Sequence, residues 1–220
     1  MVGGLATNCY LLWSTDKSAV IIDPGDEGTE IAQVINELQL KPMMILLTHG
    51  HFDHILGVID LQLIYKIPIA MGKEDAFLVD RAAAAARYFL KRNIKIPKIK
   101  SIDESLPEIK TIKLDDETIR VIKSPGHTPG GVSFYAPKSK LLFTGDTIFA
   151  DGLRGETDHQ YSSKKLLFRS ICNLLKLPDE TKVLPGHGEE TNLAEVKKLF
   201  NCNYCELPWL NGIDSIVKVF

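Results

Sequence analysis

The chain has 220 residues, of which 45% are hydrophobic and 25% are charged, the ordinary mix of a globular protein. Lys and Arg total 26 against 28 Asp and Glu, so the formal charge of −2 leaves no positive surplus for binding nucleic acid. These values exclude a largely disordered chain and predict a single domain over residues 1–220 with no nucleic-acid partner.

No membrane or export segment is expected. The longest apolar runs, 43–47 and 82–86, fall far short of the ~20 residues that a membrane-spanning helix needs. The first fifteen residues lack the basic start and long apolar core of a signal peptide. Four cysteines are too few for a disulfide scaffold in a chain of this length, and we interpret Cys202-x-x-Cys205 as an incidental pair. The sequence therefore favours a cytoplasmic protein.

The first half of the chain alternates short β-branched runs with amphipathic stretches. Residues 18–23 (SAVIID) are typical of a buried strand that ends at Pro24-Gly25, and apolar residues at helical spacing follow it. In chain order we expect strands at 18–23, 43–47 and 67–71, helices at 29–40, 55–65 and 74–91, and a loop over 94–108.

The second half continues this pattern and ends its strands in polar motifs. We expect strands at 118–123, 132–135, 141–143 and 182–184, and helices at 163–177 and 193–200. The interleaving of strands and helices predicts a layered α/β protein. The motifs IIDPG, THGH, SPGH, TGD and PGH all follow predicted strands, where ligands gather in α/β folds.

Three of the six histidines lie in one short segment, THGHFDH. His49 and His51 are two residues apart, so on extended chain their side chains point the same way and can converge on one ion. Asp53 and His54 follow where the chain turns and can face a neighbouring ion. Imidazole and carboxylate ligands suit zinc, or iron and manganese where carboxylates dominate.

Three further candidate ligands each follow a strand in a Gly- or Pro-rich turn. These are His127 in PGHTPGG, Asp146 in TGD and His187 in PGHG. Seven candidates are too many for one tetrahedral ion and suit two ions that share a bridging carboxylate.

Taken in order, these motifs resemble those of the metallo-β-lactamase-fold hydrolases. TNCY near the start and GHTPGG are similar to the small glyoxalase II-like (hydroxyacylglutathione hydrolase-like) proteins, and the resemblance covers about residues 5–199. It implies a four-layer αββα sandwich that holds two divalent metal ions in a cleft at one edge of the sheets. Zinc is expected first, with iron or manganese as alternatives.

The resemblance also implies a role for each ligand. One metal would rest on His49, His51 and His127, the other on Asp53, His54 and His187, and Asp146 would bridge them. Asp23 of IIDPG would orient a ligand histidine or the site water, although a turn-forming role in DPG is nearly as good an explanation.

The implied function is hydrolysis of an ester-like carbonyl in a small molecule, a thioester first, by a hydroxide that bridges the metals. Asp53 and Asp146 would be the catalytic carboxylates, with Asp53 able to relay a proton. Aspartate at position 146, where many β-lactamases of this superfamily have cysteine, argues against antibiotic hydrolysis. One alternative is a persulfide dioxygenase with a single iron on His49, His127 and Asp146, and another is a non-catalytic binding scaffold.

The sequence departs from the glyoxalase II-like pattern near the predicted substrate pocket. Glu156 stands where the arginine of a G-R-[ST]-D turn would fall, with Arg154 two places earlier. We expect no counterpart of the helical domain that helps full glyoxalase II enzymes bind glutathione, and we therefore expect glutathione thioesters to bind poorly. We interpret His159 as a surface or pocket-rim residue, and the aromatic residues Tyr88, Phe89 and Tyr161 as core rather than pocket.

Overall fold

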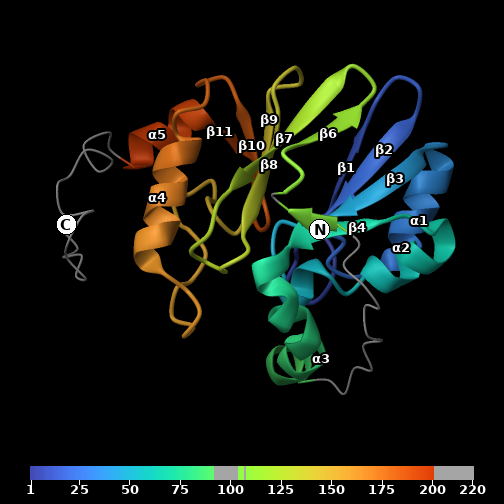
Figure 1. Cartoon of the computed structure of the whole chain (residues 1–220), viewed down its shortest axis with the longest axis horizontal. Helices are drawn as coiled ribbons and strands as arrows, with labels where there is room; N and C mark the ends of the chain where they lie inside the picture. Colours follow the sequence, from blue (N-terminus) through green and yellow to red (C-terminus); the bar gives the residue numbers. More distant parts are fainter. Residues whose placement is uncertain (92–103, 107, 201–220) are drawn as a thin grey trace.

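The computed structural model describes residues 1–91, 104–106 and 108–200 as two β-sheets packed face to face, with helices on both outer faces (Figure 1). Cys202, Cys205 and most of the loop expected over 94–108 lie outside these residues.

The first sheet contains the N-terminal strands in the order β1-β2-β3-β4-β5. β1 is antiparallel to β2, and β2 to β5 run parallel. Parallel neighbours need long crossover connections, and helices supply them here. The strands are β1 (Tyr10–Trp13), β2 (Ser18–Ile22), β3 (Lys41–Leu46), β4 (Ile69–Gly72) and β5 (Glu104–Leu106); the helices are α1 (Gly28–Glu37), α2 (Val58–Tyr65) and α3 (Ala76–Leu90), with short 3₁₀ turns η1 (Phe52–His54) and η2 (Lys73–Asp75).

The second sheet has the order β11-β10-β9-β8-β7-β6 and is antiparallel except for the parallel pair β9 and β10. Helix α4 makes the crossover between these two parallel strands. The elements are β6 (Thr111–Leu114), β7 (Glu117–Lys123), β8 (Val132–Ala136), β9 (Leu141–Gly145), α4 (Lys164–Leu174), β10 (Lys182–Pro185), β11 (Thr191–Asn192) and α5 (Leu193–Phe200).

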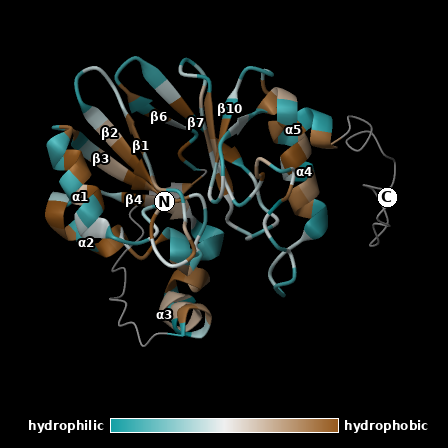
Figure 2. Ribbon diagram, turned by 180° about the vertical axis from the view of Figure 1, so that it is seen from behind, coloured by the Kyte–Doolittle hydropathy of each residue, from teal (hydrophilic) through white to brown (hydrophobic). Residues whose placement is uncertain are grey.

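Alternation along the strands produces three apolar layers. In β2, Ala19 and Ile21 pack with the helices of the first half, whereas Val20 and Ile22 pack between the sheets. A third cluster joins α4 and α5 to the outer face of the second sheet. Because successive side chains point to opposite faces, each strand serves two layers at once, and hydrophobic residues occupy long parts of the strands (Figure 2). The predicted αββα sandwich is confirmed.

The structure differs from the predicted elements mainly at the sheet edges. β1, β6 and the two-residue β11 were not predicted, and the expected loop over 94–108 contains β5. These strands have four residues or fewer and are set by pairing, as when β5 adds to β4 through Ala70 to Gly72. Within the described part of the chain, no helix is long and apolar enough to cross a membrane.

Candidate metal centre

All seven predicted ligands lie at one edge of the sandwich, where strands of both sheets end. β3 leads into the segment that holds the first four ligands, whereas β7, β9 and β10 each lead into one. The two sheets therefore bring together residues far apart in the sequence: His49, His51, Asp53, His54, His127, Asp146 and His187.

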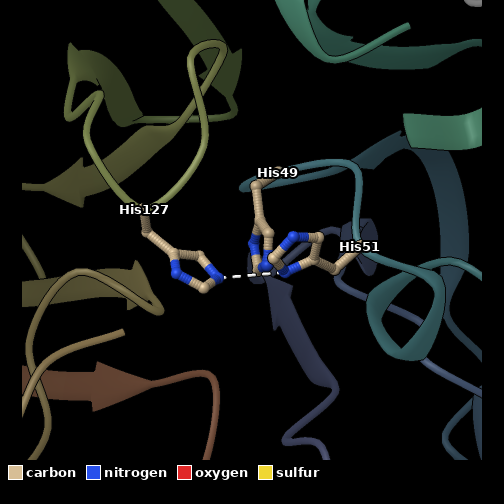
Figure 3. A group of neighbouring side chains, drawn as sticks. All are labelled: His49, His51 and His127. Atoms are coloured by element: carbon tan, nitrogen blue, oxygen red, sulfur yellow. Dashed lines mark hydrogen bonds between the residues drawn. The ribbon is translucent and has the colours of Figure 1, made fainter. Parts of the chain in front are cut away.

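The first ligand group consists of His49, His51 and His127. One ring nitrogen of each lies within 4.8 Å of the others, and the three rings converge from two separate loops (Figure 3). The nearest pair is His127 Nε2 and His51 Nδ1, at 2.9 Å. Three imidazoles that converge in this way form a set of zinc or iron ligands.

The second ligand group consists of Asp53, His54 and His187. His187 Nε2 lies 3.2 Å from Asp53 Oδ2 and 3.3 Å from His54 Nε2. This group is more open to solvent, since the His187 side chain is 27% exposed whereas that of His54 is fully buried.

Asp146 lies between the two groups. Its Oδ2 is 3.6 Å from His127 Nε2, and its Oδ1 is 3.5 Å from His54 Nε2. The backbone at Gly186 passes close to Asp146 and His54, and only glycine fits there. A Cβ at this position would come within 2.4 Å of Asp146 Oδ1 and 2.7 Å of the His54 ring. The Gly-rich turns thus let a carboxylate reach both groups, the position of a bridging ligand.

Asp23 fixes one histidine in each group. It accepts hydrogen bonds from His54 Nδ1 at 3.0 Å and from the Thr48 amide and hydroxyl at 2.7 and 2.5 Å. Since Thr48 gives its hydroxyl proton to Asp23, it accepts from His49 Nδ1, 3.0 Å away. Both rings thus turn Nε2 toward the cluster, and a carboxylate bonded to the outer nitrogen of His54 is the kind of contact that an orienting residue makes. The φ of Asp23, 49°, lies in the left-handed region, so the turn-forming role holds as well.

The remaining histidines are oriented in a similar way. His127 Nδ1 donates to the Glu156 carbonyl at 2.7 Å, and His187 Nδ1 donates to the Leu5 carbonyl at 3.1 Å, so each presents Nε2. His51 is reversed: its Nε2 lies 2.9 Å from the Tyr161 hydroxyl, which leaves Nδ1 toward the cluster. A hydrogen bond on the outer nitrogen of every ring thus turns the inner nitrogen toward the cluster.

Two buried atoms of this cluster have no hydrogen-bond partner among the described residues, His49 Nε2 and Asp146 Oδ1. Buried polar atoms are nearly always paired, so unpaired ones that point into one small space call for an explanation. Imidazole nitrogens and carboxylate oxygens are donors to divalent cations. The residues present therefore fit two divalent metal ions that share Asp146.

Electrostatics differ between the two groups. Burial lowers the pKa of His49 well below its ordinary value, and burial and the adjacent His127 lower the pKa of His51 to about 3. Burial also opposes charge on His54, but the carboxylates of Asp146 and Asp23 outweigh it and raise its pKa. His54 in turn holds the pKa of Asp146 well below its usual range, although burial opposes this. In the first group His49 and His51 thus provide neutral imidazoles, and the second group attracts positive charge.

The TNCY segment secures the second group. Thr7 donates to Asp53 Oδ2 at 3.2 Å, and Asn8 donates to the carbonyls of Pro185 and Gly188 on either side of His187. The Tyr10 hydroxyl donates to the same Pro185 carbonyl at 2.7 Å. The motif therefore holds the loop of His187 and the side chain of Asp53.

Asp75 was missed by the sequence analysis. Its buried carboxylate accepts from the Gly50 amide at 3.0 Å, the Thr128 hydroxyl at 2.7 Å and the Gly130 amide at 2.6 Å. It thereby joins the loop of His49 and His51 to the loop of His127. The one available signal was its place just after a predicted strand, shared with the ligands themselves.

A cavity of about 670 Å³ opens beside the ligands and is lined by His51, Asp53, His127, Asp146 and His187. Phe89 and Tyr161 also line it, and Tyr88 is 76% exposed, so the prediction of a core location for these aromatics is wrong. α3 extends away from the sheets and carries the Phe89 ring to the cavity instead of the interior.

The segment after Asp146 forms another part of the lining. His159 lines the cavity, which confirms the pocket-rim prediction. Glu156 holds His127 through its carbonyl while the residue as a whole is exposed, and Arg154 also faces the cavity. The departure from the G-R-[ST]-D pattern therefore falls on the lining, as expected.

Comparison with known proteins points to one family. The family model described as the metallo-beta-lactamase superfamily matches residues 2–187. Hydroxyacylglutathione hydrolase GloC of Haemophilus influenzae is 35% identical over 199 residues, which cover 87% of this chain and 90% of the relative.

Solved structures agree with this assignment. The BLEG-1 B3 metallo-beta-lactamase is 34% identical, with a TM-score of 0.82 over 96% of this chain and 97% of its own. TTHA1623 in a di-iron-bound form is 36% identical, with a TM-score of 0.80 over 90% of this chain and 94% of its own.

Proposed function

Because this chain belongs to the metallo-beta-lactamase superfamily, we propose that it is a metal-dependent hydrolase that cleaves an ester-like carbonyl, a thioester first. The observation that carries the proposal is the pair of three-residue ligand groups that share Asp146 beside an open cavity. The similarity to a hydroxyacylglutathione hydrolase supports a thioester as the substrate class.

We propose His49, His51 and His127 as ligands of one ion, Asp53, His54 and His187 as ligands of the other, and Asp146 as the bridge. Divalent ions in such a site supply Lewis-acid chemistry, which lowers the pKa of water toward neutrality and polarises a carbonyl oxygen. We propose zinc first; the di-iron form of a related structure supports iron as the alternative.

The chain's own groups orient the ligands and handle the proton. Asp53 is 13% exposed and faces the cavity, and its Oδ2 is held by Thr7 and His187. It is the carboxylate placed to accept a proton from water as the carbonyl is attacked. A thiol has a pKa near ~8.5, so it leaves as the thiolate and needs no proton from the protein.

A second candidate is the persulfide dioxygenase, which would need iron on His49, His127 and Asp146 alone. It is supported by the distance of 3.6 Å between His127 Nε2 and Asp146 Oδ2 and by the ring contact of His49 with His127. The name of one structural neighbour suggests β-lactam hydrolysis, and this reaction should be assayed as well.

Metal content and two variants separate these candidates. Protein purified without added metal should contain about two equivalents in the hydrolase and about one iron in the dioxygenase. In the hydrolase, His54→Ala should lower the content from two toward one and slow thioester hydrolysis by more than the ~10–100-fold typical of losing an orienting partner. Full metal and activity in His54→Ala, with loss of both in His49→Ala, would favour the mononuclear enzyme.

A further inference from the structure

One face of α3 forms a wall of the cavity. Leu78, Arg81, Ala85 and Phe89 lie three or four residues apart, the spacing of one helix face, and all four line the cavity. The Phe89 ring stacks on Phe52, with ring centroids 5.8 Å apart and an interplanar angle of 14°. Since Phe52 lies between His51 and Asp53, the Phe89 end of this wall is continuous with the ligand loop.

The wall has a fixed position relative to the candidate metal ligands. α3 begins directly after Asp75, whose carboxylate binds the amides of Gly50 and Gly130. A buried carboxylate with three hydrogen bonds holds the start of the helix against both ligand loops. The wall is therefore a preformed surface.

Large apolar side chains are exposed around the cavity. Phe89 is 54% exposed, Leu153 is 62% exposed and Leu5 is 42% exposed, and all three line the cavity. Phe149 completes the lining beside the His187 ring, with centroids 6.3 Å apart. Apolar side chains gathered at the opening of a site are typical of a surface that an apolar ligand covers.

Two arginines add positive charge to the same cavity. Arg81 and Arg154 both line it, and neither forms a salt bridge with any residue that the structure describes. Arg81 lies over the Phe77 ring, with its guanidinium carbon 5.4 Å from the centroid. Of the carboxylates that line the cavity, Asp53 and Asp146 belong to the ligand cluster, and Glu156 is exposed and forms no salt bridge with any described residue. The guanidiniums therefore remain available for an anionic group on a ligand.

We propose that the substrate is a thioester with an unbranched apolar acyl chain, which lies along Ala85 and Phe89 at the end of the α3 face that meets Phe52, and with an anionic thiol carrier that Arg81 and Arg154 recognise. This inference rests on the proposed thioester hydrolysis. With the carbonyl at the ligand cluster, the acyl chain meets the wall beside Phe52, and the carrier extends toward the charged part of the lining. The anion is a carboxylate or a phosphate, which the carriers below distinguish.

The experiment uses the metal-loaded protein and acetyl, butyryl, hexanoyl and octanoyl thioesters of three thiols. N-acetylcysteamine is neutral, glutathione carries carboxylates and coenzyme A carries phosphates. We expect kcat/KM to rise about 2–4-fold with each added methylene, and KM to be lower for an anionic carrier than for the neutral one. A flat or falling chain-length series would overturn the apolar acyl site, and equal KM values for all three carriers would overturn the anion site.

Two variants with matched controls test the residues. Phe89→Ala should lower the octanoyl-to-acetyl ratio of kcat/KM by about 10-fold, whereas Leu63→Ala, another exposed apolar side chain on a helix, should leave it unchanged. Arg81→Gln should raise KM for the anionic carriers by about 10-fold, whereas Arg87→Gln on the same helix should not. Equal effects in variant and control would contradict the assignment.

A binding measurement separates this inference from the proposed reaction. Calorimetry with the non-hydrolysable S-ethyl and S-octyl thioethers of coenzyme A and glutathione should show tighter binding of S-octyl than of S-ethyl to wild type, with the difference reduced in Phe89→Ala. If no thioester is hydrolysed but this preference holds, the proposed reaction is wrong and the apolar site stands. If thioesters are hydrolysed and the preference is absent, the inference is wrong and the reaction stands.

Discussion

The ligand cluster and the apolar wall of α3 meet in one cavity but are built in different ways. The outer ring nitrogen of every histidine in the cluster is hydrogen-bonded to Thr48, Asp23, Tyr161 or a backbone carbonyl. Apart from Arg81, the wall consists of apolar side chains such as Phe89, which is half exposed and makes ring contacts with Phe52 and Tyr88. Chemistry that depends on charge and exact donor direction needs a closed hydrogen-bond network, whereas shape recognition tolerates an open surface.

Removal of metal should affect the cluster most. A strong chelator should abolish hydrolysis, and zinc, iron or manganese should restore it. Unfolding free energy should fall as well, by about 4 kcal/mol when the metal had been present at a thousandfold excess over its Kd. Activity assays and thermal unfolding check both outcomes, with circular dichroism as the control that the fold persists. Full activity in a demonstrably metal-free sample would contradict the proposal.

Asp23→Asn should have the next largest effect, because one carboxylate orients a histidine in each ligand group. The asparagine side chain has the same shape, but its NH₂ would face Thr48 or His54, which both donate to Asp23 in the wild type. We expect metal affinity to fall about 10–100-fold, as measured by competition with a chromophoric chelator. Asp26→Asn, in the same turn and outside the network, is the control. Unchanged affinity in Asp23→Asn would reduce Asp23 to a turn former.

Asp75→Asn tests the link between the ligand cluster and the wall. The asparagine has one acceptor oxygen where Asp75 uses two, so at least one buried donor from Gly50, Thr128 or Gly130 loses its partner. We expect unfolding free energy to fall by about 1–3 kcal/mol in denaturant titrations, together with weaker metal binding. Asp80→Asn, exposed on α3, should change neither quantity. If the variant loses stability but keeps its metal affinity, the hydrogen bonds of Asp75 stabilise the fold and do not support metal binding.

Tyr161→Phe should have the smallest effect on the cluster. It removes one hydroxyl beside His51 Nε2 and leaves the ring in the cavity lining. A single hydrogen bond contributes about 0.5–1.5 kcal/mol, so we expect metal affinity to fall about 2–10-fold. Tyr88→Phe, which removes an exposed hydroxyl from α3, should have no such effect. A larger loss of metal than in Asp23→Asn would reverse the order of importance proposed for these contacts.

The sequence by itself predicted which candidate ligands lie together and that strands and helices form layers. His49 and His51 lie two apart after a strand, and His127, Asp146 and His187 each follow a strand in a Gly-rich turn; these are local patterns that a single chain segment carries. The alternation of apolar residues that both sheets bury is local in the same sense, so the layered α/β class was predictable, whereas the αββα arrangement was implied by the resemblance of the motifs.

Only the tertiary structure decided what surrounds the ligands. The Leu5 carbonyl that orients His187 lies 182 positions away, Tyr161 lies 110 positions from His51, and Asp75 joins loops 25 and 55 residues distant. Helical spacing likewise placed Phe89 on α3 without showing that this face meets a cavity. Periodicity describes which side of an element a residue occupies, but the partner of that side is set by the packing of distant elements.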